Sequence, residues 1–186
     1  MNAPSPSDTS ARGAHARAAD SKLLGIYLND HLAGATAGVL RAGHLARASS
    51  GTALGRDVGP VAREIAQDRA ALLGIMRDLG VPVRRYKVCA GWAGERLGRL
   101  KSNGRLIRRS PLSTVLELEA LRMAVEGKAA GWQTLRRLGA VDRRLDAAQL
   151  DTLLERARRQ QRTLEDWRIR EAEAVFGATR KQASGE

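Results

Sequence analysis

Aromatic side chains are scarce in this chain. One phenylalanine, two tyrosines and three tryptophans make up 3% of its 186 residues, although hydrophobic residues as a whole reach 43%. A chain of this length can bury a sizeable core, and that core must be assembled from leucine, alanine, valine and isoleucine. Such a composition favours helices that pack closely through small side chains.

Cysteine, proline and long apolar runs are also rare. The single Cys89 cannot form an internal disulfide, so we interpret it as a small buried thiol in a protein of the reducing cytoplasm. The five prolines leave long helices uninterrupted. No apolar run approaches the roughly 20 residues that span a bilayer, and the first residues lack the apolar centre of a signal peptide. We therefore expect a cytoplasmic protein with no membrane partner.

Positive charge is abundant, with a net charge of +12 from 32 lysines and arginines against 20 acidic residues. Such an excess can indicate a nucleic-acid partner or an acidic membrane surface. It also arises in a chain that is rich in arginine, alanine and glycine throughout. Arginines occur in every predicted helix, which favours the second interpretation.

Apolar residues recur at helical spacing in four long segments. The first has a stripe that includes Leu28, Val39 and Leu45, and the other three show the same periodicity. Start and stop signals flank the later segments, among them Gly80 after the second and Asp146 before the fourth. The predicted helices are Leu23–Arg47, Pro60–Leu79, Pro111–Leu138 and a segment from Asp146 to Phe176.

The rest of the chain is predicted to connect or flank these helices. Residues 1–20 and 177–186 are polar and read as disordered tails, which leaves 21–176 as the folded domain. Ser50–Asp57 is a glycine-rich loop. About thirty residues separate the second and third helices, and a connection of that length should contain structure of its own. Within it, Val88–Leu100 is predicted to form a short extra helix.

The connection lengths define a fold. Helices joined by short, long and short connections form two hairpins linked by one crossover, which is the ferritin-like arrangement. The chain from Leu23 to Phe176 thus resembles the ferritin-like four-helix-bundle superfamily, and its YLNDHLAGATAG stretch is similar to the opening helix of bacterial proteins with degenerate di-iron motifs. We expect an all-α, antiparallel four-helix bundle with the short extra helix in the long crossover between helices 2 and 3.

The resemblance implies a metal centre only if the ligands are present. Di-iron members of the class use a Glu on each of two helices and a Glu-x-x-His pair on the other two. The residues three positions after Glu64, Glu119 and Glu165 are glutamine or arginine, and the first helix offers His31 or Asp30 in place of Glu. Arginine has no free lone pair for a metal and stays protonated. No cofactor and no ordinary di-iron centre are therefore predicted.

A polar interior is nevertheless expected, with at least one contribution from each helix. Unpaired buried charges cost several kcal/mol, so these groups must pair or bind a ligand. We favour a network in which Arg168, with Arg122 as a second candidate cation, neutralises Glu119 and Glu126. In the same network His31 is hydrogen-bonded to Asp68. The alternatives are a pocket in which Arg168 holds an anion and an atypical Zn, Mn or Fe site. The predicted polar core is His31, Asp68, Glu119, Glu126, Gln161, Arg168 and Glu171. The weak metal candidates are His31, Glu64, Asp68, Glu119, Glu126 and Glu165.

One basic run in the crossover provides a second candidate site. Without interleaved aromatic residues it is not a stacking platform for bases, so a solvated surface is favoured over a phosphate-binding patch. Its members are Arg96, Arg99, Lys101, Arg105, Arg108 and Arg109. These patterns predict a structural or interaction role rather than catalysis, and no catalytic residue is assigned. A metal-binding bundle, a nucleic-acid-binding bundle and a homo-oligomer are the alternatives.

Overall fold

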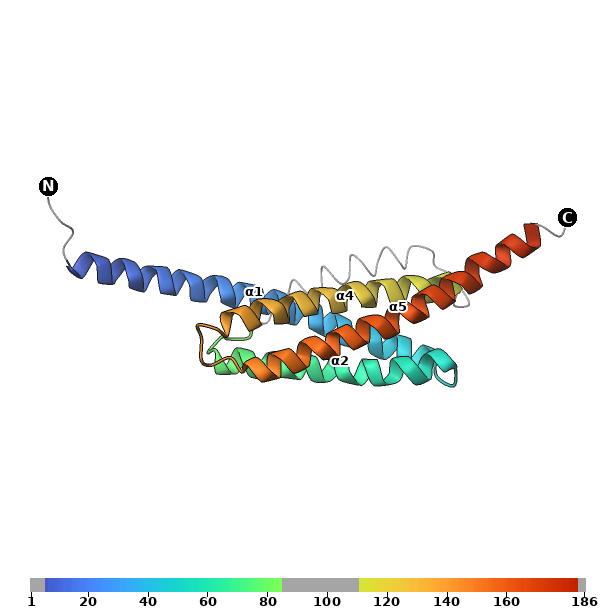
Figure 1. The fold of residues 1–186 in the computed structure, drawn as a ribbon, viewed down its shortest axis with the longest axis horizontal. Helices are drawn as coiled ribbons and strands as arrows, with labels where there is room; N and C mark the ends of the chain where they lie inside the picture. The colour runs from blue at the N-terminus through green and yellow to red at the C-terminus, as the bar shows by residue number, and fades with distance from the viewer. Residues whose placement is uncertain (1–5, 85–110, 184–186) are drawn as a thin grey trace.

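The computed structural model describes the backbone of residues 6–84 and 111–183 and the side chains of residues 21–84 and 112–177. These ranges form four helices and contain no strand, as Figure 1 shows. The prediction of an all-helical, four-helix architecture is confirmed. The predicted short helix Val88–Leu100 lies outside the described residues. The helices are α1 (Pro6–Ala48), α2 (Ala53–Asp78), α4 (Pro111–Leu138) and α5 (Ala147–Ala183).

Two clusters of buried side chains give the direction of each helix. At one end, Leu28 near the start of the packed part of α1 meets Met76 at the end of α2, Leu135 at the end of α4 and Leu150 at the start of α5. At the other end, Leu45 from the end of α1 belongs to a cluster that takes its α2 and α4 residues from the beginnings of those helices. Hence α1 and α5 run in one direction and α2 and α4 in the opposite one.

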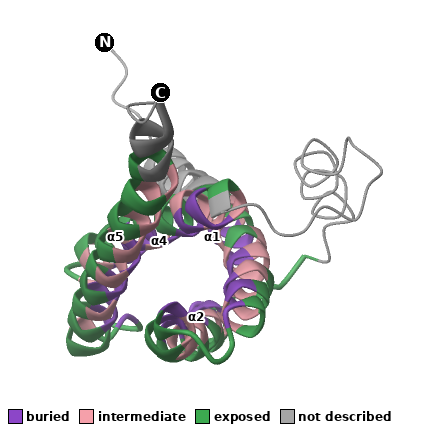
Figure 2. Cartoon of the chain, turned by 90° about the vertical axis from the view of Figure 1, so that its right-hand side faces the viewer, coloured by how far each residue is buried: buried purple, intermediate pink, exposed green. Residues whose placement is uncertain are grey.

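Accordingly, α2 and α4 end at the same end of the bundle, and α4 begins at the opposite end. The neighbouring pairs are α1 with α2, α4 with α5, α1 with α4 and α2 with α5. Viewed along the bundle in Figure 2, the buried positions of all four helices face the shared interior. Leucine dominates this interior, as the low aromatic content requires.

Core positions alternate at spacings of three and four residues, the heptad pattern of coiled-coil packing. On α4 the inward residues are Leu118, Leu121, Val125, Lys128, Trp132 and Leu135. On α2 the same alternation includes Asp68, and on α5 it includes Gln160. One acidic, one basic and one amide side chain thus occupy positions that apolar residues hold elsewhere in the core.

The turn between α1 and α2 is tighter than predicted. The hydroxyl of Thr52 accepts a hydrogen bond from the amide of Gly55 (3.1 Å), so Thr52 is the N-cap and α2 begins at Ala53. The predicted loop Ser50–Asp57 and helix start at Pro60 are therefore wrong. Pro60 lies in the second turn of α2 and does not mark the first residue of the helix.

The remaining stop and start signals behave as predicted. Gly80 has φ of +69° and donates to the carbonyl of Arg77 (2.9 Å), while Val81 donates to Met76 (2.8 Å), which together end α2 in a Schellman motif. Before α5, the carboxylate of Asp146 accepts from the amides two and three residues further on. Asp146 is thus the predicted N-cap.

The first and last helices, α1 and α5, are longer than predicted. The first helix begins at Pro6 rather than near Asp20, and the last ends at Ala183 rather than at Phe176. Figure 1 shows that α1 projects beyond the bundle at one end and α5 at the other. Both extensions are rich in alanine and arginine, which are strong helix formers. They lack an apolar stripe, so periodicity could not reveal them.

Candidate functional site

Asp68 is the centre of a polar layer inside the bundle, which consists of Glu64 and Asp68 on α2, Lys128 on α4, and Arg156 and Gln160 on α5. Asp68 is only 1% exposed because it occupies an inward heptad position of α2. Its Oδ2 accepts a hydrogen bond from Lys128 Nζ (2.5 Å) and its Oδ1 accepts one from Arg156 Nη1 (2.9 Å). Both carboxylate oxygens are thus engaged by cations, one from α4 diagonally across the bundle and one from the neighbouring α5.

Gln160 completes the polar layer and connects the two sides of it. Its amide Nε2 donates to Glu64 Oε2 (2.9 Å) and to Asp68 Oδ2 (3.3 Å). Its carbonyl Oε1 accepts from Lys128 Nζ (2.5 Å). Gln160 is 1% exposed, so these bonds replace the water that its amide would otherwise bind.

The polar layer is electrically balanced, since two carboxylates face one ammonium and one guanidinium. Burial lowers the pKa of Lys128 from its usual value, and the carboxylate of Asp68 opposes part of that shift. Removing one partner would leave a buried charge uncompensated, which costs more than the pair contributes. We therefore expect the members of the layer to be energetically coupled.

The arrangement leaves few ligand atoms free for a metal ion. Asp68 already uses both oxygens, and the guanidinium of Arg156 places positive charge at the same carboxylate. In the part of the chain whose side chains are described, no group of three or more His, Cys, Asp or Glu side chains is placed to hold a metal. The weak metal candidates His31, Glu64 and Asp68 do not come together as a cage.

His31 lies at the α1–α4 contact rather than in the polar layer. Its ring centroid is 4.4 Å from that of Tyr27, and its ring covers the backbone of Gly131. Burial lowers the pKa of His31, and the charge of Asp30 opposes that shift. The predicted hydrogen bond from His31 to Asp68 is not made, because the imidazole turns toward α4 while Asp68 faces α4 and α5 from α2.

The carboxylates predicted on α4 lie on its flank beside α5, where solvent reaches them. Arg168 forms a bidentate pair with Glu165 (2.9 and 2.7 Å) and approaches Glu119 to 3.8 Å. Gln161 donates to Glu126 (2.6 Å). The predicted pairing of Arg168 with Glu119 is present, but these side chains are 28% and 43% exposed, so their predicted place in the interior is wrong.

The error comes from the two apolar sides of α4. Only the side with Leu118 and Leu121 faces the core, whereas Leu116 and Met123 on the other side are exposed. Apolar residues on two sides of a helix favour burial all round, which is the basis of the interior prediction for Glu119 and Glu126. The intervening polar strip therefore lies at a rim, and Glu171 on α5 is likewise partly exposed.

Three members of the polar layer escaped the sequence prediction: Lys128, Arg156 and Gln160. Lys128 and Gln160 could have been found by extending the heptad alternation through them, because each continues the spacing of the leucines around it. Arg156 carries no such signal, since it reaches Asp68 from the edge of α5 and remains partly exposed.

A shallow cleft of about 290 Å³ lies between α2 and α5, near the end where α5 leaves the bundle. Trp167 contributes its Nε1 as a donor to Asp57 Oδ2 (3.0 Å), and the guanidinium of Arg170 lies 5.1 Å from the indole centroid. Two arginines and two aspartates line the cleft, so it has no excess of either charge. The predicted basic run Arg96–Arg109 and Cys89 lie outside the described residues.

Comparison with known proteins identifies no relative: no family model matches the chain, and neither a curated protein nor a solved structure matches it. The described helices include none that is long and apolar enough to cross a membrane. The fold and the polar layer thus define a four-helix bundle with an internally paired ionic core.

Proposed function

We propose that this protein is a non-catalytic bundle of the ferritin-like arrangement, in which the polar layer stands where related folds hold a metal, and that it works through its exterior. The main evidence for this proposal is that both carboxylate oxygens of Asp68 are engaged, one by Lys128 and the other by Arg156. The parallel course of α2 and α4 supports the ferritin-like arrangement, because it requires one long crossover. A cytoplasmic location is part of the proposal and follows from the single cysteine.

The polar layer has a structural use that supports this role. A shift of one helix along another would move Asp68 opposite leucines and leave its charge unpaired, at a cost of several kcal/mol. Polar residues at single core positions fix the register of packed helices in this way. A bundle with a fixed register presents a constant outer surface, which a binding role requires.

Metal analysis tests the proposal. Protein purified without a chelating tag is expected to contain far less than one equivalent of iron, manganese or zinc, and added metal is expected to leave its melting temperature unchanged. Stoichiometric metal that is lost in Asp68→Asn, or in Glu119→Gln on the flank, would overturn it. Asp151→Asn is the control, because Asp151 forms an exposed pair with Arg136 away from both places.

Nucleic-acid binding is the second candidate, and it is based on the density of positive charge in one segment of the sequence. Residues 85–110 contain eight lysines and arginines and one glutamate. Binding through such a segment would weaken steeply with salt. A titration with double-stranded DNA and with single-stranded RNA tests this candidate. Loss of binding in a variant with Arg105, Arg108 and Arg109 replaced by glutamine would support it, and no binding at low salt would exclude it.

A further inference from the structure

The outer face of the α4–α5 hairpin carries an exposed apolar patch, the α4–α5 patch. It has five members, of which Phe176 is 59% exposed and Met123 is 58% exposed. The other three are each more than 40% exposed. Together they account for more than half of the large hydrophobic side chains that are exposed in the described part of the chain. The patch consists of Leu112, Leu116, Met123, Ile169 and Phe176.

The ion pairs between α4 and α5 show that these residues share one end of the hairpin. Arg168 contacts Glu119, and Glu165 contacts Arg122 (3.0 Å). Because the helices are antiparallel, residues before Glu119 on α4 lie level with residues after Arg168 on α5. The first turns of α4, with Leu112 and Leu116, therefore lie beside the part of α5 that contains Phe176.

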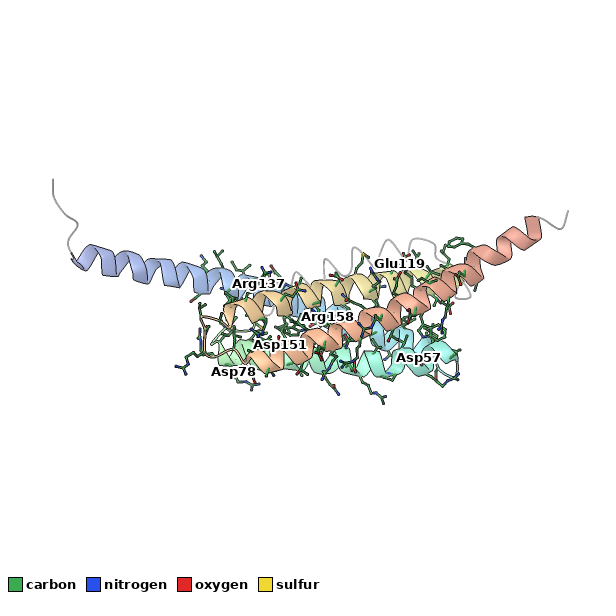
Figure 3. The ribbon with its side chains drawn as sticks, viewed as in Figure 1. Asp57, Asp78, Glu119, Arg137, Asp151 and Arg158 are labelled. Carbon is green, nitrogen blue, oxygen red and sulfur yellow. The ribbon has the colours of Figure 1, made fainter. Side chains whose placement is uncertain are left out.

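Charged residues continue the same outer stripes along the hairpin. On α5, Arg162 precedes Ile169 by seven residues and Phe176 by fourteen, so all three share one stripe. On α4, Glu119 and Glu126 follow Leu112 at the same seven-residue spacing. Figure 3 labels Glu119 on α4 and Arg158 on α5. Arg158 and Arg162 are exposed, and neither has an ion-pair partner among the described side chains.

We infer that the α4–α5 patch binds the same patch of a second copy of this chain, with the two-fold axis parallel to the helices. This rotation lays α4 of one copy against α5 of the other with the apolar ends at the same level. It also brings the acidic row of α4, with Glu126, opposite the basic row of α5, with Arg162, because Glu126 lies level with Gln161 on α5. A face that is acidic on one helix and basic on the other is complementary to itself.

The area of the α4–α5 patch suits such a dimer. Five side chains that are each about half exposed offer roughly 400 Å² per copy. A stable interface buries about 800 Å² per partner, of which somewhat more than half is apolar. The patch would thus form the apolar centre, and the charged rows would form the rim. This inference rests on the proposed interaction role and names the partner. Bound metal in the core would contradict the proposed function, but it would not change the mass that sedimentation equilibrium measures.

Sedimentation equilibrium over a concentration series tests the inference. The wild-type protein is expected to have twice the 20.1 kDa mass of one chain. Leu116→Glu and Phe176→Glu each place a charge in the interface and should raise the dimer dissociation constant by about tenfold or more. Leu40→Glu is the matched control, because Leu40 is 70% exposed on α1. A monomeric wild-type protein, or a dimer that tolerates both patch variants, would overturn the inference.

Charge reversal separates this dimer from any other association. Glu126→Arg and Arg162→Glu should each weaken dimerisation, because each places like charges together. The double variant should restore much of the loss by reversing both rows at once. A double variant as weak as the sum of the two single variants would show that these rows do not meet. Circular dichroism of each variant monitors whether the fold is retained.

Discussion

The imidazole of His31 on α1 fills the space that a β-carbon on residue 131 of α4 would need. A Cβ built on Gly131 would stand 2.9 Å from His31 Nδ1 and 3.0 Å from Cε1. The two helices can therefore approach closely only because residue 131 has no side chain. Tyr27 supports the other side of this contact, since its hydroxyl donates to Thr134 Oγ1 (3.1 Å) on α4.

Gly131→Ala is expected to destabilise the bundle by about 1–3 kcal/mol, because the imidazole has to move out of a packed contact. Gly127→Ala, four residues away on the same helix, is the control, since a Cβ there meets no atom within 4 Å. That variant should gain about 0.5–1 kcal/mol from better helix propensity. Urea denaturation measures both, and equal effects of the two changes would contradict the close contact.

The stability of the protein should decrease as the pH falls through 6.5, the usual pKa of histidine. Burial lowers the pKa of His31 in the folded state. The unfolded chain therefore binds a proton at His31 more readily than the folded chain does. Above pH 6.5 the ring is neutral in both states, and stability is then lost with falling pH until the folded-state pKa is passed.

Denaturation midpoints between about pH 5 and pH 8 measure this dependence. His31→Gln should flatten the slope relative to wild type. His44→Gln is the control, because His44 is exposed at the edge of the α1–α4 contact. An unchanged slope in the His31 variant would show that another group causes the dependence.

Asp68→Asn should cost about 3–5 kcal/mol, because it leaves Lys128 and Arg156 without their shared carboxylate. Replacing Asp68, Lys128 and Gln160 together by leucine should recover most of that loss, since no charge then remains at a core position. Glu64 and Arg156 would still reach solvent. Urea denaturation of both variants tests whether the polar layer acts as a unit, and a triple variant less stable than Asp68→Asn would contradict this.

Gly55→Ala should disrupt the turn between α1 and α2. A Cβ at this position would lie 2.1 Å from the backbone oxygen of Ser49, which cannot move without opening the turn. We expect a loss of about 3 kcal/mol or more, at the upper end of overpacking effects. Gly74→Ala on the same helix meets no atom within 4 Å and should be neutral or mildly stabilising. Thermal melts of the two variants provide the comparison.

The four helices could be predicted because each combines an apolar stripe with local end signals. Gly80 and Asp146 mark ends through backbone chemistry that does not depend on the rest of the fold. The start of α2 could not be placed from Pro60, because a hydroxyl at Thr52 begins the helix earlier. The projecting part of α1 has no apolar stripe, so the sequence pattern did not predict that the helix begins as early as Pro6.

The candidate site was predicted only in part. Asp68 was identified because a short acidic side chain within an apolar stripe has no route to water. Lys128 was not predicted, because a long basic side chain usually reaches solvent. Glu119 and Glu126 were placed inside because the sequence does not reveal which apolar side of α4 receives neighbours. That choice depends on the packing of all four helices.

The opposite exits of α1 and α5 determine how the bundle would bear a mechanical load. Tension between the two projecting helices would act along the helix axes, so the hairpins would have to slide past each other in shear. Such sliding must separate Asp68 from its cations and draw leucines across charged groups at the same moment. A molecule pulled from its two ends would therefore be loaded in shear across the polar layer, rather than peeled apart turn by turn.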